Sequence, residues 1–440
     1  MPHQHVAYYL FRNGGTFSKL QWWCPTTPRT YLAPLLQGFH DRQKQTLETF
    51  LGSPLSSHQW TQAKLPTKLG GLGLSSGRTE IGLEVVSLAD LAFLASHRQC
   101  APHIQQLLHA PLSPHFCECE EPAARHLAAY IPDLASSLRD PQAHLDHKAV
   151  LNRIHHHVHL GLVQQHDRVG QARLTAYAAP FADFSWNQDT LLSNVAFRDS
   201  PSMRLGVSVF DDSMACSFCQ QPLDTYGHHC MNCMGQGHKQ VMHTSFRNVV
   251  YRLAARAGAR PALETPHLLP DQPRARPADV LIVTLPDVHQ SSWRRFPKLA
   301  LDCAITSPFQ SSVLRPSATT PLAAADRYTD LKRQHTDMQQ RCARQNLGFE
   351  PLVLESTGGF CGETATLLQS LAKVVDTREH LPPGHTWQRL QESLSIDLQR
   401  GLHGACLKQR QQWSRSTLSL TEVGAGGLHG HVRIKLVFAI

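Results

Sequence analysis

Four metal-ligand residues within 18 positions constrain the fold of this chain more than any other feature of its sequence. Cys216 and Cys219 are separated by two residues, and His228 and Cys233 follow after gaps of eight and four residues. Zinc prefers four thiolate or imidazole ligands in a tetrahedron, and a C-x2-C turn presents two thiolates from one tight loop. Because the chain supplies all four ligands, the site is closed. The pattern therefore predicts a structural Zn²⁺ in a short segment that has too few residues for a core of its own.

The same segment offers other ligands and another interpretation. His229 and Cys230 lie next to the predicted histidine. A cluster of free thiols is the alternative to a metal site. The choice between thiols and disulfides depends on the compartment. The first residues lack the basic and apolar regions of a signal peptide, and no run of 18 apolar residues predicts a membrane span. We expect a protein that is neither secreted nor in a membrane, where the twelve cysteines are thiols or metal ligands.

The composition is that of a folded chain with several parts. Hydrophobic residues make up 41% and charged residues 17% of 440 residues, which excludes a disordered chain. Helical spacing of apolar residues dominates the N-terminal half, including a predicted helix pair over residues 82–110. Short apolar runs, typical of buried strands, follow the cysteine-rich segment at Val280–Thr284, Leu299–Ile305 and Phe349–Leu354. An amphipathic helix is predicted from Thr244 or Ser245 to near Gly258.

Two aspartates accompany the predicted strands. Asp279 directly precedes the first strand, and Asp302 lies inside the second, within Ala300–Ile305. An ionised side chain among strand-forming apolar residues is unfavourable unless it has a partner. A hard divalent cation is a suitable partner for two carboxylates, and Mg²⁺ held in this way can polarise a phosphodiester. The pair therefore predicts a magnesium site.

Three further residues are candidates for this site. Glu264 precedes the first strand and Glu355 ends the last, so either carboxylate can complete the metal ligands. Lys332, on the helix that follows the second strand, can stabilise charge on a phosphate or on the attacking water. Each residue also has an ordinary interpretation: Asp279 as a turn or cap residue, Asp302 as the partner of an arginine, and Lys332 as a solvated side chain.

The charge of this region favours a nucleic-acid partner. The whole chain has a formal net charge of +8, which proves little by itself. Between residues 244 and 300, however, nine Arg and Lys residues face four Asp and Glu residues, a balance of +5. A metal-carboxylate site in a basic field suits phosphate chemistry.

These motifs together resemble the C-terminal part of a non-LTR retrotransposon polyprotein, in elements that carry a restriction-like endonuclease. The motifs are LPTKLGGLGL at 65–74, the segment Cys216–Cys233 with Asp224, Gly227 and His228, RPAD at 276–279, LDCAITS at 301–307 and ESTGG at 355–359. The resemblance covers roughly residues 45–410. It implies a reverse transcriptase thumb-like helical region, then a CCHC zinc knuckle, then a nuclease of the PD-(D/E)xK class.

The resemblance also assigns roles to residues. Cys216, Cys219, His228 and Cys233 match the zinc knuckle, and Asp279 and Asp302 match the acids that hold the catalytic metal. The family's catalytic lysine lies two residues after the second acid or on the next helix. Ala304 occupies the first position, so Lys332 is the candidate, with Arg327 and Tyr328 nearby. This departure concerns the activity of the nuclease and not its fold.

The polymerase part of such an element is missing from the sequence. No Tyr/Phe-x-Asp-Asp turn is present, and Phe210-Asp211-Asp212 lacks the intervening residue and follows the thumb-like segment. We therefore expect a truncated or split element that cannot polymerise DNA. The expected function is Mg²⁺-dependent nicking of target DNA to prime reverse transcription. The alternatives are a zinc-containing nucleic-acid-binding remnant without activity and a remnant that folds poorly.

The resulting prediction is an α+β protein in five parts. They are a thumb-like helical remnant (1–110), a helical linker (111–209), a zinc knuckle (210–243), a restriction-like endonuclease with a mixed sheet flanked by helices (244–375) and a helical tail (376–440). The expected partners are DNA and element RNA, with a separate reverse transcriptase chain as a further one. Chromosomal DNA as the target implies the nucleus in a eukaryote.

Overall fold

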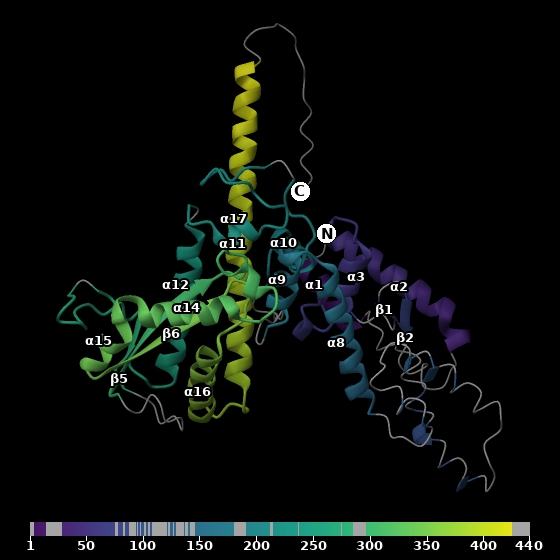
Figure 1. Ribbon diagram of the computed structural model, residues 1–440, viewed down its shortest axis with the longest axis horizontal. Helices are drawn as coiled ribbons and strands as arrows, with labels where there is room; N and C mark the ends of the chain where they lie inside the picture. The colour runs from purple at the N-terminus through teal and green to yellow at the C-terminus, as the bar shows by residue number, and fades with distance from the viewer. Residues whose placement is uncertain are drawn as a thin grey trace.

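The computed structural model combines a largely helical N-terminal half with a sheet-containing C-terminal half (Figure 1). It describes residues 4–14, 29–74, 78–81, 84–87, 146–179, 191–211, 214–235, 237–273, 275–284 and 296–424, together with scattered residues between 94 and 140. The predicted linker over 111–209 therefore lies partly outside the described residues. None of the helices in the described part of the chain combines the length and the apolar composition that a bilayer crossing requires.

The N-terminal half packs its helices around a second buried cluster, to which α17 (His385–Gly424) adds Ile396. Trp60, Leu47 and Phe197 are almost fully buried there, and Tyr8 donates a hydrogen bond to the carbonyl of Leu72. The helices and strands of this half are α1 (Gln4–Gly14), α2 (Arg29–Leu51), α3 (Ser57–Lys64), the 3-10 turn η2 (Thr67–Leu69), β1 (Arg78–Ile81), β2 (Glu84–Ser87), α8 (His147–Gln165), α9 (Arg168–Tyr177) and α10 (Asn194–Leu205).

One secondary-structure prediction in this half was wrong. The helical spacing over 82–110 predicted a helix pair, but Glu84–Ser87 form strand β2, which pairs antiparallel with β1. The β-branched Val85 and Val86 stand at the centre of the paired stretch and favour a strand. The described residues between 94 and 107 that carry a helical conformation agree with the second half of that prediction.

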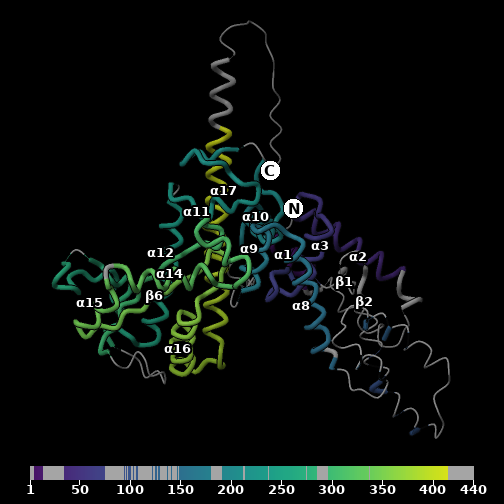
Figure 2. The backbone as a smooth tube through the Cα atoms, viewed as in Figure 1, coloured from purple at the N-terminus to yellow at the C-terminus, as the bar shows by residue number. Residues whose placement is uncertain are grey.

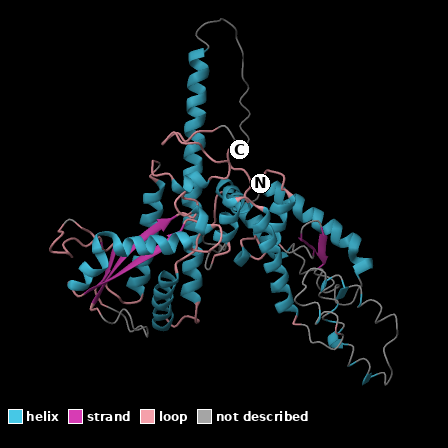
Figure 3. Cartoon of the chain, in the orientation of Figure 1, coloured by secondary structure: helices cyan, strands magenta, loops and turns pink. Residues whose placement is uncertain are grey.

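The C-terminal half is built on a mixed four-stranded sheet (Figure 3). The strands β3 to β5 are antiparallel neighbours, and β6 pairs with β5 in parallel, in the order β3-β4-β5-β6. The elements are α11 (His228–Asn232), α12 (His238–Arg256), β3 (Pro261–Leu263), β4 (Val280–Ile282), β5 (Lys298–Thr306), α13 (Leu314–Ser317), α14 (Ala323–Gln334), η5 (His335–Asp337), α15 (Met338–Arg344), β6 (Leu347–Glu355), α16 (Gly362–Arg378) and α17 (His385–Gly424).

The three predicted strands of this half are confirmed within two residues at each end, as β4, β5 and β6. The first strand, β3, was missed because it has only three residues and begins with a proline. The amphipathic helix is also present, but α12 begins at His238, after Gly237 in a left-handed conformation, and not at Thr244. Its C-terminal end near Gly258 is as predicted. The general prediction of an α+β fold agrees with this architecture.

A single buried cluster connects the cysteine-rich segment, the sheet and α17. It contains Cys216 and Cys230, Leu301 of β5, and Leu394 and Leu402 of α17. In Figure 2, α17 runs as a long axis past both halves of the molecule. Asp199 of α10 accepts hydrogen bonds from Arg410 and His403 of α17, which ties the N-terminal half to it. The predicted boundaries at 243/244 and 375/376 thus run through a shared core.

Candidate functional site

The cysteine-rich segment folds into a tight turn followed by the short helix α11. Cys216 N–H donates to the carbonyl of Gln221, and Ala215 forms a bridge with Pro222, so the C-x2-C stretch is a closed loop. Asp224 then caps α11 by accepting hydrogen bonds from the backbone N–H groups of His228 and His229. These local hydrogen bonds bring the thiols of Cys216 and Cys219 close to helix α11 and to the thiol of Cys233, which directly follows that helix.

Four ligand atoms meet at that point. They belong to Cys216, Cys219, His229 and Cys233, and all lie within 4.8 Å of one another. The Sγ atoms of Cys216 and Cys233 are 3.8 Å apart, and Cys219 Sγ is 3.3 Å from His229 Nε2. Zn–S bonds of about 2.3 Å in a tetrahedron place sulfur atoms about 3.8 Å apart. This Cys3His group can therefore hold a Zn²⁺ ion, as the cysteine spacing predicted.

The choice of His228 as the fourth ligand is corrected to His229. The His228 ring stacks on Phe309 with 3.8 Å between ring centroids, and its Nδ1 lies 3.6 Å from Asp224. Burial lowers the pKa of His228 to about 4, so this ring is a neutral packing element. Successive residues of a helix point about 100° apart, which is why only one of two adjacent histidines can reach the thiols.

A glutamine from α17 supports the Cys3His group from outside. Gln409 is 1% exposed. Its Nε2 donates to Cys216 Sγ at 2.8 Å, and its Oε1 accepts from Ser217 N–H at 3.0 Å. Burial by itself raises the pKa of Cys216, but hydrogen bonds from the Phe218 and Cys219 backbone and from Gln409 outweigh it and lower the pKa to about 6. The thiolate form that a metal needs is thus favoured.

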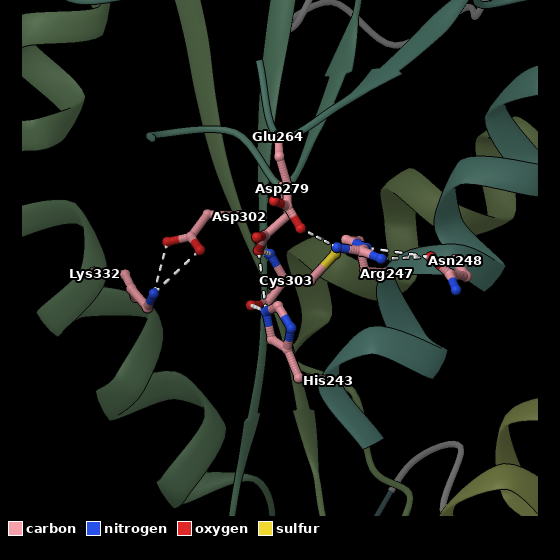
Figure 4. Close-up of polar contacts among 8 residues, drawn as sticks. All are labelled: His243, Arg247, Asn248, Glu264, Asp279, Asp302, Cys303 and Lys332. Atoms are coloured by element: carbon pink, nitrogen blue, oxygen red, sulfur yellow. Dashed lines mark hydrogen bonds and ion pairs between the residues drawn. The ribbon is translucent and has the colours of Figure 1, made fainter. Parts of the chain in front are cut away.

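The two predicted aspartates belong to neighbouring segments of the sheet (Figure 4). Asp279 stands directly before β4, and Asp302 is in the middle of β5. The Asp279 N–H donates to the carbonyl of Leu301 at 2.9 Å, and Asp279 Oδ2 accepts from Cys303 N–H at 2.8 Å. Both side chains are partly exposed, 21% for Asp279 and 17% for Asp302, so a solute can reach this carboxylate pair.

Lys332 lies where the sequence predicted it, beside the second acid. Its Nζ is 2.9 Å from Asp302 Oδ2 and 3.1 Å from Oδ1. Burial raises the pKa of Asp302; the charge and hydrogen bond of Lys332 lower it, and the neighbouring Asp279 raises it again. A second negative charge near a buried carboxylate makes the ionised form of that carboxylate less favourable, so a neighbouring cation stabilises it more. Within the described part of the chain, Lys332 is the cation that contacts Asp302.

Glu264 is near the pair but is already held by other side chains. It follows β3, and its N–H donates to the carbonyl of Asp279. Its carboxylate is an ion-pair partner of Arg247 and, at 3.1 Å, of Arg276. Arg247 and Arg276 therefore place two positive charges at the edge of the carboxylate pair, and Glu264 partly balances them.

Glu355 does not join this site, so its prediction as a member of it was wrong. The parallel register pairs Asp302 with Pro351 and Thr306 with Glu355, which puts Glu355 four residues further along the sheet, about 13 Å away. Its carboxylate is fully buried and accepts hydrogen bonds from the Ala325 N–H, at the start of α14, and from Thr357. Burial raises its pKa to about 7.

The raised pKa of Glu355 makes the stability of the protein depend on pH. Between the unfolded pKa of 4.5 and the folded value of about 7, the folded chain holds a proton that the unfolded chain releases. The protonated carboxyl group of Glu355 therefore makes its full contribution to the free energy of unfolding below pH 4.5. This contribution, up to about 3 kcal/mol, is lost as the pH rises through 7. We expect Glu355→Gln to remove this loss. Urea denaturation of both proteins from pH 4.5 to 8.5 measures it, and parallel stability curves contradict the prediction.

His243, on α12, is a residue of this site that sequence reasoning missed. Its Nε2 is 3.2 Å from Asp279 Oδ2 and 2.9 Å from the carbonyl oxygen of Cys303. The hydrogen bond with Asp279 raises its pKa, against the effect of burial. A signal existed in the sequence: His243 borders the apolar stripe of Met242, Phe246 and Val249, so it faces the same sheet as they do.

No protein-family model matches the chain, and no curated protein was found to be similar to it.

Proposed function

We propose that the chain is a metal-dependent endonuclease that nicks DNA, derived from a non-LTR retrotransposon. One observation carries this proposal: Asp279 directly precedes β4, Asp302 lies on the neighbouring strand β5, and the ammonium group of Lys332 is in contact with Asp302 (Figure 4). Two partly exposed carboxylates and a lysine are groups that can bind a divalent cation and catalyse the hydrolysis of a phosphodiester.

Each residue has a distinct part in the proposed reaction. Asp279 and Asp302 fit a divalent cation because both are partly buried anions that solvent still reaches. A bound divalent cation polarises the phosphodiester and lowers the pKa of an attacking water. The Cys303 backbone N–H holds Asp279 in one orientation. Lys332, already 2.9 Å from Asp302, supplies positive charge for a phosphate oxygen in the transition state.

DNA is the proposed substrate because the surroundings of the pair are basic. The segment 244–300 has an excess of five positive charges, and Arg247 and Arg276 lie at the edge of the site through their contacts with Glu264. Such residues position a phosphate backbone without reading its sequence. We further propose element RNA as a second partner, a separate reverse transcriptase chain for polymerisation, and a nuclear location in a eukaryotic host.

A nicking assay tests the function. Supercoiled plasmid is incubated with the protein and Mg²⁺ or Mn²⁺, and the relaxed form is measured against time. We expect Asp302→Asn to reduce the nicking rate by a hundredfold or more, on the order expected when a metal carboxylate is lost. The matched control is Asp271→Asn, the same change at an exposed aspartate that pairs with Arg341 in the same half of the molecule.

The outcomes separate the proposal from its alternative. Nicking that is present in the wild type and the control but lost in Asp302→Asn supports the nuclease. Equal background activity in all three preparations, purified by the same route, excludes it. A gel-shift experiment on the same proteins then identifies the alternative, a zinc-containing nucleic-acid-binding remnant, if the wild type binds DNA without cutting it.

A further inference from the structure

The carboxylate pair has a neighbour that can take part in metal binding itself. His243 Nε2 is within 3.2 Å of Asp279 Oδ2 and 2.9 Å of the Cys303 carbonyl oxygen. The three atoms come from α12, from the residue before β4 and from β5, so the packing of three elements brings them together (Figure 4). Cys303 immediately follows Asp302, so its carbonyl belongs to the same short stretch of β5.

The spacing of these atoms fits one shared ion. Octahedral bonds of about 2.1 Å separate neighbouring ligand atoms by about 3.0 Å. The two separations measured from His243 Nε2, 3.2 Å and 2.9 Å, bracket this distance. Of the two ring nitrogens, Nε2 faces the oxygens, while Nδ1 is buried and has no hydrogen-bond partner among the described residues.

We propose that His243 Nε2 is a direct ligand of the metal ion held by Asp279 and Asp302, together with the Cys303 carbonyl oxygen. This inference rests on the proposed metal-dependent function. Mg²⁺ is a hard cation that binds oxygen, whereas an imidazole nitrogen adds more to the affinity of a first-row transition metal. The site therefore selects an ion such as Mn²⁺ over Mg²⁺.

Another role of His243 predicts the opposite effect. If Nε2 carries the ring proton, it donates to both oxygens and fills the place of the cation, so it competes with the metal. A ligand nitrogen and a donor nitrogen require different tautomers. Removing the ring lowers Mn²⁺ affinity if His243 is a ligand, and raises it if His243 is a competitor.

Mn²⁺ binding to the full-length, zinc-loaded protein tests the proposal. Free Mn²⁺ is measured by electron paramagnetic resonance, Mg²⁺ is used as the competitor, and pulsed measurements detect the nitrogen coupling of a bound imidazole. We expect wild type to bind Mn²⁺ at least about tenfold more tightly than Mg²⁺, and His243→Ala to lose about tenfold in Mn²⁺ affinity and to lose the nitrogen coupling. Its Mg²⁺ affinity should change by less than about threefold. The control is Arg252→Ala, an exposed residue of the same helix.

A second variant separates ligation from folding. His243→Gln keeps a side chain that can hydrogen-bond to Asp279 and Cys303, so a structural role predicts wild-type Mn²⁺ binding for it, whereas ligation predicts the loss seen with alanine.

Unchanged or tighter Mn²⁺ binding in His243→Ala overturns the inference, as does bound Mn²⁺ without nitrogen coupling in the wild type. Nitrogen-coupled Mn²⁺ in a protein that does not nick DNA keeps the inference and rejects the nuclease. Absence of Mn²⁺ binding rejects the inference, and nicking in Mg²⁺ alone then retains the nuclease.

Discussion

Removal of Zn²⁺ from the Cys3His group is expected to unfold the cysteine-rich segment and to loosen α17 from the molecule. Cys216 and Cys233 are part of the main buried cluster, and Gln409 of α17 hydrogen-bonds to the Cys216 sulfur, so two of the four ligands are also core residues. Structural zinc sites contribute on the order of 10 kcal/mol, which is comparable with the whole stability of a typical domain. We expect one Zn²⁺ per chain, and a large fall in the thermal midpoint after chelation.

Two adjacent histidines provide a matched pair for this prediction. His229→Ala should lower zinc affinity by a hundredfold or more, because its Nε2 lies 3.3 Å from Cys219 Sγ. His228→Ala removes the stacking on Phe309 and should reduce stability by about 2 kcal/mol while the protein still binds one Zn²⁺. Zinc content after gel filtration and hydrogen exchange of α17 measure both effects. A fully folded protein without zinc contradicts the prediction.

The cysteines of this site were predictable and the histidine was not, for a physical reason. A C-x2-C turn is a local structure, so the sequence spacing alone brings its two thiols together. The histidine depends on where α11 begins. The Asp224 cap starts the helix at His228 and thereby turns His229 toward the thiols. Gln409, 193 residues from Cys216 in the sequence, has no local signal at all.

The residues of the carboxylate site were likewise only partly predictable from the sequence. Asp279 and Asp302 were predictable because polar residues in short apolar runs stand out, and neighbouring strands bring them together. Lys332 was a candidate only from its place on the helix after the second strand and from the family resemblance, because nothing in its own helix marks it. Glu355 looked equivalent to Glu264 in the sequence, but the parallel register of β5 and β6 places it at the end of β6, four residues beyond the position that pairs with Asp302. Strand register depends on long-range packing, which spacing along the chain does not contain.

The motif LPTKLGGLGL at 65–74 forms a tight turn that packs against α3. After η2, the chain returns against the end of α3, with Leu72 N–H donating to Ala63 and Gly73 N–H donating to Leu65. Arg204, which is 1% exposed, donates to the carbonyls of Gly71 and Thr67 and holds the turn from α10. The turn is thus a junction of the N-terminal core, which is a structural role for the motif.

Gly71→Ala is expected to destabilise this junction by about 3 kcal/mol or more. A Cβ at residue 71 would lie 2.0 Å from the carbonyl oxygen of Leu65 and 2.6 Å from that of Gln62. Both contacts are with backbone atoms, so relief requires the turn to separate from α3, and the hydrogen bonds of Leu72, Gly73 and Arg204 are lost with it. Thermal unfolding measures the total effect, and loss of hydrogen-exchange protection at 62–74 locates it.

Gly161→Ala supplies the control, because it makes the same chemical change where space is open. Gly161 lies inside α8, and a Cβ there meets nothing within 4 Å. Alanine is the better helix former, so this variant should be more stable than wild type by about 0.5–1 kcal/mol. Opposite signs at the two glycines attribute the loss at Gly71 to the close backbone approach. Equal stabilities of Gly71→Ala and wild type would mean that the turn does not pack against α3, and the junction role of the motif would then be rejected.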